Sequence, residues 1–223
     1  MKDGFIKVAA GTPDIKVADC EYNRAEITAL IDRAHAQGVR ILVLPELCIT
    51  GYTCQDLFFQ QELLDGALAA LEKITAHTAG MDMLVAVGCP LRFRGELYNC
   101  AVVIKDGNVL GVVPKKFLPN YNEFYEKRHF TAAPEGQYDI ALFGECVPFG
   151  LGLLFECREI PELVFAAELC EDLWAAEPPS ISLALGGATI IANLSASNET
   201  IVKDAYRRDL VSGQSARLLC GYI

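Results

Sequence analysis

The sequence predicts an α/β fold built on a mixed β-sheet. Two observations carry this prediction: apolar runs rich in leucine and β-branched residues alternate with segments of helical period, and one pair of runs is joined by a tight hairpin turn. The chain has 223 residues, of which 52% are hydrophobic and 22% are charged, and this suffices for one substantial core. We therefore expect a single domain over residues 1–223.

The first 80 residues predict a strand, a helix, a buried strand and a second helix. Residues 5–13 are a short apolar strand candidate, and residues 20–39 follow with a helical pattern. Residues 40–47 form a continuous run typical of a strand covered on both faces. Residues 60–80 return to helical period. The apolar residues that set the first helical pattern, and the glycine that ends it, are Ile27, Leu30, Ile31, Ala34 and Gly38.

A strand over residues 82–90 and a hairpin over residues 98–115 come next. The hairpin turns at Asp106-Gly107, a dipeptide favoured in two-residue turns. Residues 120–137 break the regular alternation, because they are aromatic and charged without a clear period. We expect this segment to be either a solvated loop or a functional one.

Two more buried strands are predicted near the end of the chain. They cover residues 162–170 and 188–195, and a loop and a helix in residues 171–187 separate them. This alternation gives the α/β class but does not by itself define how many sheets the strands form.

The charge and composition exclude several function classes. A formal net charge of -10 argues against a nucleic-acid groove, which normally carries a basic stripe. No run reaches the 18 apolar residues of a membrane span, and the N-terminal apolar run is too short and too charged for a secretory signal. We therefore expect a cytoplasmic protein with neither a nucleic-acid nor a membrane partner.

The nine cysteines are scattered and form no CxxC pair, and only three histidines accompany them. A zinc site has few ligands to draw on, so no metal is expected. Most of these thiols are expected to be buried small hydrophobes. Cys170 raises a question because carboxylates at Glu168, Glu171 and Asp172 flank it, and acidic neighbours disfavour the thiolate. A group elsewhere in the chain has to activate it.

Three chemically useful residues come at the ends of predicted strands. Glu46 lies at the end of one strand, Lys115 ends the hairpin and Cys170 ends a later strand, and ligand sites of α/β proteins gather beyond such ends. Taken singly, Glu46 has the alternative of capping a helix, Lys115 of being a solvated loop charge and Cys170 of packing. Together they provide a general base, a cation for an oxyanion and a nucleophile, with no histidine required.

These residues lie in sequence blocks that resemble the nitrilase superfamily. The blocks are "LVLPELCITGY", "VVPKKFLPNYNEFYEKRHF" and "LVFAAELCEDLW". More narrowly, "GYTCQDLFFQ", "KFLPNYNEFYEKRHF" and "ANLSASN" resemble the glutaminase domain of glutamine-dependent NAD synthetases. The resemblance runs from about residue 5 to the last residue. It implies an α-β-β-α sandwich in which two mixed sheets pack between helical layers, and domains that pair into homo-oligomers.

The resemblance also implies a role for each residue. Glu46 would be the general base, Cys170 the nucleophile, and Lys115, rather than the adjacent Lys116, the oxyanion-stabilising cation. Glu126 would be a further glutamate near the nucleophile. The positions that match the glutamine pocket are Tyr52, Tyr121, Glu171 and Ser197. The implied reaction is hydrolysis of glutamine through a Cys170 thioester, with ammonia supplied to a synthetase domain.

Nothing in the sequence offers a phosphate loop of the G-x-x-x-x-G-K or S-G-G-x-D-S type. We therefore expect no cofactor in this domain, and ATP and deamido-NAD only in a C-terminal synthetase domain outside these residues. We also expect the chain to stop inside its own domain, since residues 217–223 read as the start of a strand. Two alternatives stay open: a free-standing amidase or carbamoylase with the same three residues, and a catalytically silent interaction module.

Overall fold

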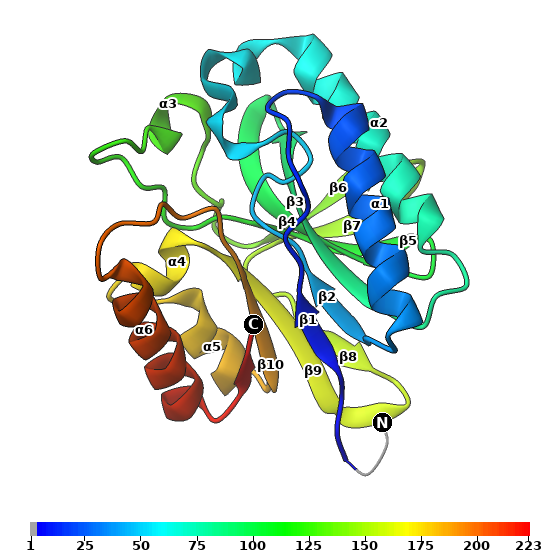
Figure 1. Ribbon diagram of the computed structural model, residues 1–223, viewed down its shortest axis with the longest axis vertical. Coiled ribbons are helices and arrows are strands. Elements are labelled where there is room, and N and C mark those ends of the chain that lie inside the picture. Colours follow the sequence, from blue (N-terminus) through cyan, green and yellow to red (C-terminus); the bar gives the residue numbers. More distant parts are fainter. Residues whose placement is uncertain (1–3) are drawn as a thin grey trace.

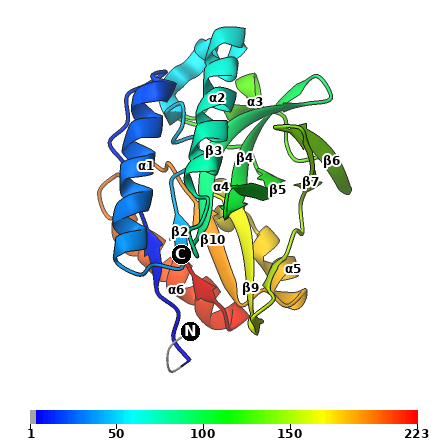
Figure 2. The same cartoon turned by 90° about the vertical axis from the view of Figure 1, so that its right-hand side faces the viewer.

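Two β-sheets pack face to face between two layers of helices (Figure 1). The structure, a computed structural model, describes residues 4–223, so the first three residues of the predicted domain lie outside it. Helices α1 and α2 lie side by side on the outer face of one sheet, as Figure 2 shows, and α5 and α6 lie on the outer face of the other. The α-β-β-α sandwich implied by the resemblance is confirmed.

The first sheet has seven strands in the order β1-β2-β3-β4-β5-β7-β6, and it is mixed. β1 and β2 pair in parallel, as do β2 and β3, whereas β3, β4 and β5 are antiparallel. Its strands are β1 Val8–Ala10, β2 Ile41–Val43, β3 Leu84–Phe93, β4 Glu96–Lys105, β5 Asn108–Pro114, β6 Gln137–Leu142 and β7 Glu145–Gly150.

The second sheet has four strands in the order β11-β10-β9-β8. β9 pairs in parallel with β10 and antiparallel with β8, so this sheet is also mixed. Its strands are β8 Phe155–Cys157, β9 Ile160–Leu169, β10 Ile190–Leu194 and β11 Gly221–Tyr222. The helices are α1 Cys20–Ala36, the 3-10 helix η1 Tyr52–Phe59, α2 Gln61–His77, α3 Glu126–His129, α4 Glu171–Trp174, α5 Pro179–Leu185 and α6 Lys203–Leu218.

Successive side chains of the buried strands point to opposite faces of their sheet, and this explains the sandwich. In β3, Val85 and Val87 face the layer of α1 and α2, whereas Ala86 between them faces the second sheet. In β10, Ile190 faces the first sheet and Ile191 faces the layer of α5 and α6. Because both faces of each central strand are covered, the strands read as unbroken apolar runs, as is typical of such layers.

Most of the elements expected from the sequence are present with adjusted ends. Both long N-terminal helices form, and Ile27, Ile31 and Ala34 are buried whereas Leu30 is half-buried. The hairpin of β4 and β5 turns at Asp106 and Gly107, which both have positive φ. The expected strand over residues 5–13 is only β1, three residues long.

Several elements were not expected from the sequence, namely η1, α3, β6, β7, β8 and α6, of which α3 lies within the segment expected to be a loop. Helix α6 is the longest of them, with 16 residues, but it buries only Gln214. A helix without an apolar stripe carries no periodic signal. Among residues 4–223, no helix is both long enough and apolar enough to cross a membrane.

Candidate active site

Lys115 lies between two buried carboxylates, beyond the carboxyl ends of strands β2 and β5 of the first sheet. Its Nζ is 2.6 Å from Oε1 of Glu46 and 2.6 Å from Oε1 of Glu126. Lys115 directly follows β5, Glu46 lies three residues beyond β2, and Glu126 is the first residue of α3. All three side chains are at most 4% exposed. Residues far apart in sequence thus form one cluster that is closed to solvent.

Gly88 allows the Glu46 loop to cross β3 at close range. A Cβ built on Gly88 would collide with the nitrogen of Leu47 and the carbonyl oxygen of Pro45, and it would lie 2.7 Å from the carbonyl carbon of Glu46. Only glycine fits such a close approach of two backbones. The loop is thereby seated directly on the strand.

Asn99 and Tyr52 complete the cluster from two further elements. The amide of Asn99, in β4, donates to Oε1 of Glu46 at 2.7 Å and to Oε2 of Glu126 at 3.4 Å. The hydroxyl of Tyr52 donates to Oε1 of Glu126 at 2.7 Å. Asn99 was not predicted from the sequence, although a fully buried amide within an apolar strand is a usable signal.

The charged groups in this cluster shift the pKa values of one another. Burial and the charge of Glu46 raise the pKa of Glu126 to about 7, against the opposing effects of Lys115 and Tyr52. Burial alone would lower the pKa of Lys115, but the charges of Glu46 and Glu126 outweigh it and hold that pKa above its ordinary value. Lys115 is therefore a permanent buried cation at neutral pH.

Cys170 occupies a strained turn between β9 and α4. Its backbone has φ 39° and ψ -98°, and its amide donates to the carbonyl of Leu194 at 3.0 Å. A non-glycine residue at such a φ is uncommon and is retained mainly at functional sites. Burial, followed by the charge of Glu46, raises the pKa of this thiol to about 12, against the effects of Lys115 and a hydrogen bond from Ser195. The resting sulfur is a thiol that needs a base.

Asp172 ties the two halves of the site together through backbone hydrogen bonds. Its Oδ1 accepts from the amides of Lys116 at 3.1 Å and Phe117 at 2.7 Å, and its Oδ2 accepts from the amide of Leu169 at 3.0 Å. These donors flank Lys115 on one side and Cys170 on the other. The buried carboxylate thus fixes the separation of the cation and the thiol.

A cleft of about 460 Å³ is lined in part by Glu171, the residue that directly follows Cys170. Tyr121 and Glu171 line it together, and the hydroxyl of Tyr121 donates to Oε2 of Glu171 at 2.9 Å. Burial and Glu171 raise the pKa of Tyr121 to about 12, so this hydroxyl remains a donor at neutral pH. Lys116 also lines the cleft, away from the buried position of Lys115.

Apart from Cys170 and Ser197, the predicted site residues fall into two groups. Four of them meet in the buried cluster, namely Glu46, Lys115, Glu126 and Tyr52. Two line the cleft, Tyr121 and Glu171. Ser197 joins neither group by a side-chain hydrogen bond: its hydroxyl lies 3.5 Å from the carbonyl of Asn198. Tyr52 directs its hydroxyl to Glu126 and is absent from the cleft lining. Their individual roles stay predictions.

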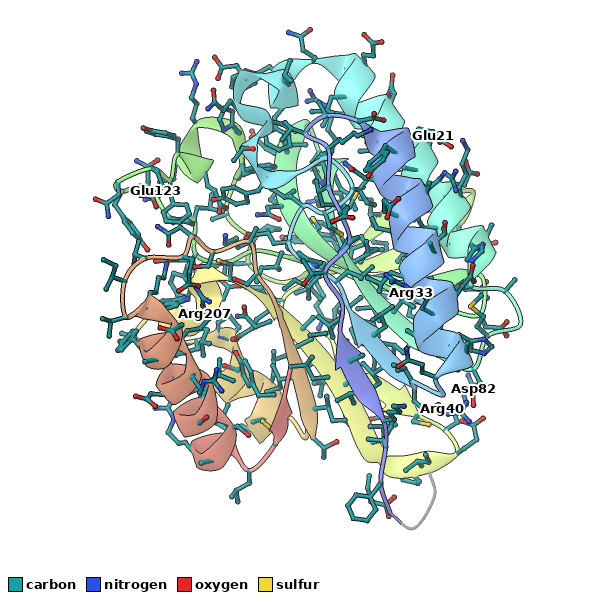
Figure 3. The ribbon with its side chains drawn as sticks, viewed as in Figure 1. Glu21, Arg33, Arg40, Asp82, Glu123 and Arg207 are labelled. Carbon is teal, nitrogen blue, oxygen red and sulfur yellow. The ribbon has the colours of Figure 1, made fainter. Side chains whose placement is uncertain are left out.

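The segment that follows β10 contacts the segment that precedes α3. The amide of Asn198, after β10, donates to Glu123, which precedes α3, and its carbonyl accepts from Nη2 of Arg207 at 2.9 Å. Figure 3 shows Glu123 and Arg207 on the same side of the molecule. The segment after β10 is therefore held between the segment before α3 and helix α6.

Comparison with known proteins identifies relatives that match nearly the whole chain. The model of the family described as carbon-nitrogen hydrolase matches residues 7–212. A glutamine-dependent NAD(+) synthetase of Mycobacterium tuberculosis is 41% identical over 220 residues, which are 99% of this chain and 32% of that protein. The chain therefore spans about a third of the length of the curated relatives it matches.

Solved structures give the same assignment of the fold. The crystal structure of a glutamine-dependent NAD(+) synthetase from Cytophaga hutchinsonii matches with a TM-score of 0.86 and 34% identity, covering 97% of this chain and 35% of that one. An amidase from Nesterenkonia sp. matches with a TM-score of 0.74 and 16% identity, covering 100% of this chain and 77% of that one. The latter similarity concerns the fold alone.

Proposed function

The chain belongs to the carbon-nitrogen hydrolase family, and from this premise we propose that it hydrolyses the side-chain amide of glutamine through a Cys170 thioester. The observation that carries the proposal is Lys115, which is held between the buried carboxylates of Glu46 and Glu126 beside the strained Cys170. Glutamine is proposed as the substrate because the similar synthetases are named as glutamine-dependent.

The first half of the proposed reaction transfers the acyl group to Cys170. Glu46 accepts the thiol proton as sulfur attacks the γ-carbonyl carbon, and Lys115 stabilises the oxyanion that develops. The carbon-nitrogen bond then breaks, and the proton held by Glu46 passes to the departing ammonia. Because the pKa of Cys170 is raised to about 12, this removal of the proton is a necessary step.

The second half returns the enzyme to its starting state. Water gives a proton to Glu46 and attacks the thioester carbon, and Lys115 again stabilises the oxyanion. The carbon-sulfur bond breaks, glutamate leaves, and the Cys170 sulfur recovers its proton. Tyr121 and Glu171 are proposed to bind the polar end of glutamine, since both line the cleft.

The proposed recipient of the ammonia is a synthetase domain of the kind present in the full-length relatives. ATP and deamido-NAD would be handled by that domain. We also propose that this domain forms homo-oligomers, and analytical ultracentrifugation would measure its oligomeric state.

Release of glutamate and ammonia from glutamine tests the proposal, with short aliphatic amides and N-carbamoyl compounds as competing substrates. We expect glutamine to be hydrolysed fastest, and Cys170→Ala to have no activity. Faster turnover of aliphatic amides or carbamoyl compounds would favour a free-standing amidase or carbamoylase. Absence of turnover and of a thioester with every amide would favour a silent interaction module.

A further inference from the structure

The turn that follows β10 contacts both the nucleophile and the base of the proposed site. The hydroxyl of Ser195 donates to the sulfur of Cys170 at 3.3 Å, and the amide of Ala196 donates to Oε2 of Glu46 at 3.2 Å. The parallel register explains this position: Leu194 in β10 pairs with Leu169 in β9, so the next residue of each strand, Ser195 and Cys170, are neighbours. The sheet itself thus delivers a hydroxyl to the sulfur.

The Ser195 hydroxyl has a specific place among the groups around the sulfur. Among residues 4–223, it makes the only hydrogen bond to Sγ of Cys170. Burial opposes the thiolate most, and the charges of Glu46 and Glu126 oppose it further. Lys115 and Ser195 are the main groups that lower the pKa of the thiol, and Lys115 is already engaged by two carboxylates. A thiolate formed here therefore needs a hydrogen-bond donor that is not already engaged by another anion.

We propose that Ser195 is a further catalytic residue, whose hydroxyl stabilises the Cys170 thiolate each time it forms. The inference rests on the proposed function, which defines the two reaction steps at which the thiolate forms. When Glu46 takes the thiol proton, the Ser195 hydrogen bond gains an anionic acceptor and strengthens. When the carbon-sulfur bond of the thioester breaks, the same bond receives the departing thiolate. Ser195 keeps its own proton throughout, so it is neither the base nor a second nucleophile.

Five titratable groups from other elements and loops act on Cys170. They are Glu46 after β2, Lys115 after β5, Glu126 in α3, Tyr52 in η1 and Tyr121 in the segment before α3. A serine hydroxyl does not titrate in the range of an enzyme assay, so Ser195→Ala changes no charge. A shift in thiol reactivity therefore reports the lost hydrogen bond rather than an altered ion pair.

Alkylation of Cys170 by iodoacetamide, followed by peptide mass spectrometry from about pH 6 to pH 9, tests the inference without glutamine. This range lies below the pKa of the thiol, which is raised to about 12, so the alkylation rate at each pH reports the small thiolate fraction. In Ser195→Ala we expect that pKa to rise by about one further unit, since a hydrogen bond to a charged group is lost. The thiolate fraction then falls about tenfold, and its higher nucleophilicity offsets part of this, so alkylation slows about three- to fivefold. Ser195→Thr keeps the hydroxyl and should restore most of the rate.

A control and a second readout separate catalysis from folding. Ser182→Ala removes a hydroxyl that donates to the carbonyl of Pro179 within α5, and this variant should be alkylated as the wild type is. With glutamine, Ser195→Ala should lower kcat about tenfold and leave KM nearly unchanged, because the hydroxyl contacts sulfur rather than the substrate. Circular dichroism compares the folding of all variants.

The outcomes distinguish this inference from the proposed function. Wild-type alkylation and turnover in Ser195→Ala would overturn the inference and leave glutamine hydrolysis intact. A slowed alkylation rescued by Ser195→Thr supports the inference, even if the wild type hydrolyses no glutamine and the proposed function fails. Equal slowing in Ser195→Ala and Ser195→Thr would show that the hydroxyl is not responsible, and this would also overturn the inference.

Discussion

The ammonium nitrogen of Lys115 lies 2.6 Å from Oε1 of Glu46, and neither side chain is exposed to solvent. Strands β3 and β4 separate the two strands that these residues follow, so the pair forms only when the centre of the first sheet is assembled. A buried ion pair is weak support for stability, because desolvation opposes the Coulomb attraction. Its electrostatic influence on Cys170 points to a chemical role for the pair.

Removing either member of this pair should have separable effects on catalysis. Glu46→Gln keeps the shape and removes the base, so glutamine turnover should fall by about 10²–10⁴-fold. Lys115→Met removes the cation, and turnover should fall by about 10²-fold or more through the oxyanion. Stopped-flow measurement of thioester formation and of its hydrolysis checks both. Normal turnover in both variants would contradict the assigned roles.

Cys170→Ala should abolish thioester formation and leave the fold intact. A glutamine-like diazo-ketone should label Cys170 in preference to the other eight thiols, because this cysteine directly precedes the cleft residue Glu171 and is influenced by the charges of Glu46 and Lys115. Cys146 is the matched competitor, since it is the exposed thiol of the chain. Labelling of Cys146 that equals labelling of Cys170 in peptide mass spectrometry would show that exposure, not the site, governs reactivity.

The sequence was sufficient to predict the site residues that lie at the ends of buried strands. Glu46, Lys115 and Cys170 could be singled out because each follows an unbroken apolar run, and the resemblance to the nitrilase superfamily is confirmed by the family match over residues 7–212. The same apolar runs predicted the central strands of both sheets. The physical reason is that covered strands leave a strong, local signal.

The sequence was insufficient where the determining contacts are long-range or made by backbone. Asp172 functions through three main-chain amides from two separate segments, and no pattern of side chains encodes such contacts. Ser195 reaches the sulfur through the register of β9 and β10, which depends on tertiary pairing. Helix α6 has no apolar stripe to reveal it, because only Gln214 is buried.

Gly88→Ala should impair the site through the backbone rather than through any catalytic side chain. The added methyl group would collide with the loop from Pro45 to Leu47, so Glu46 must move. Overpacking of this kind costs about 1–3 kcal/mol of unfolding free energy. Gly213→Ala is the matched control, because nothing lies within 4 Å of a Cβ at that helical position. Urea denaturation and glutamine turnover should show both losses for Gly88→Ala and neither for Gly213→Ala.

Glu126 should make the free energy of unfolding depend on pH. Burial and Glu46 raise its pKa from 4.5 to about 7, so between these values the folded chain holds a proton that the unfolded chain has released. The stabilisation is complete below about pH 4.5 and is lost as the pH rises through about 7. The slope contributed by this proton is at most about 1.4 kcal/mol per pH unit, and stability falls with rising pH.

Glu126→Gln should remove this slope, because glutamine keeps the shape and cannot titrate. Urea denaturation from about pH 5 to pH 8 measures it, and the difference between wild type and variant isolates Glu126 from the other groups of the cluster. Glu62→Gln, on the exposed surface of α2, is the matched control and should leave the pH dependence of the wild type unchanged. If the wild type lost stability toward acid relative to Glu126→Gln, the carboxyl would be ionised throughout this range. Lys115 would then have to hold two full negative charges, and the charge balance assigned to the cluster would be wrong.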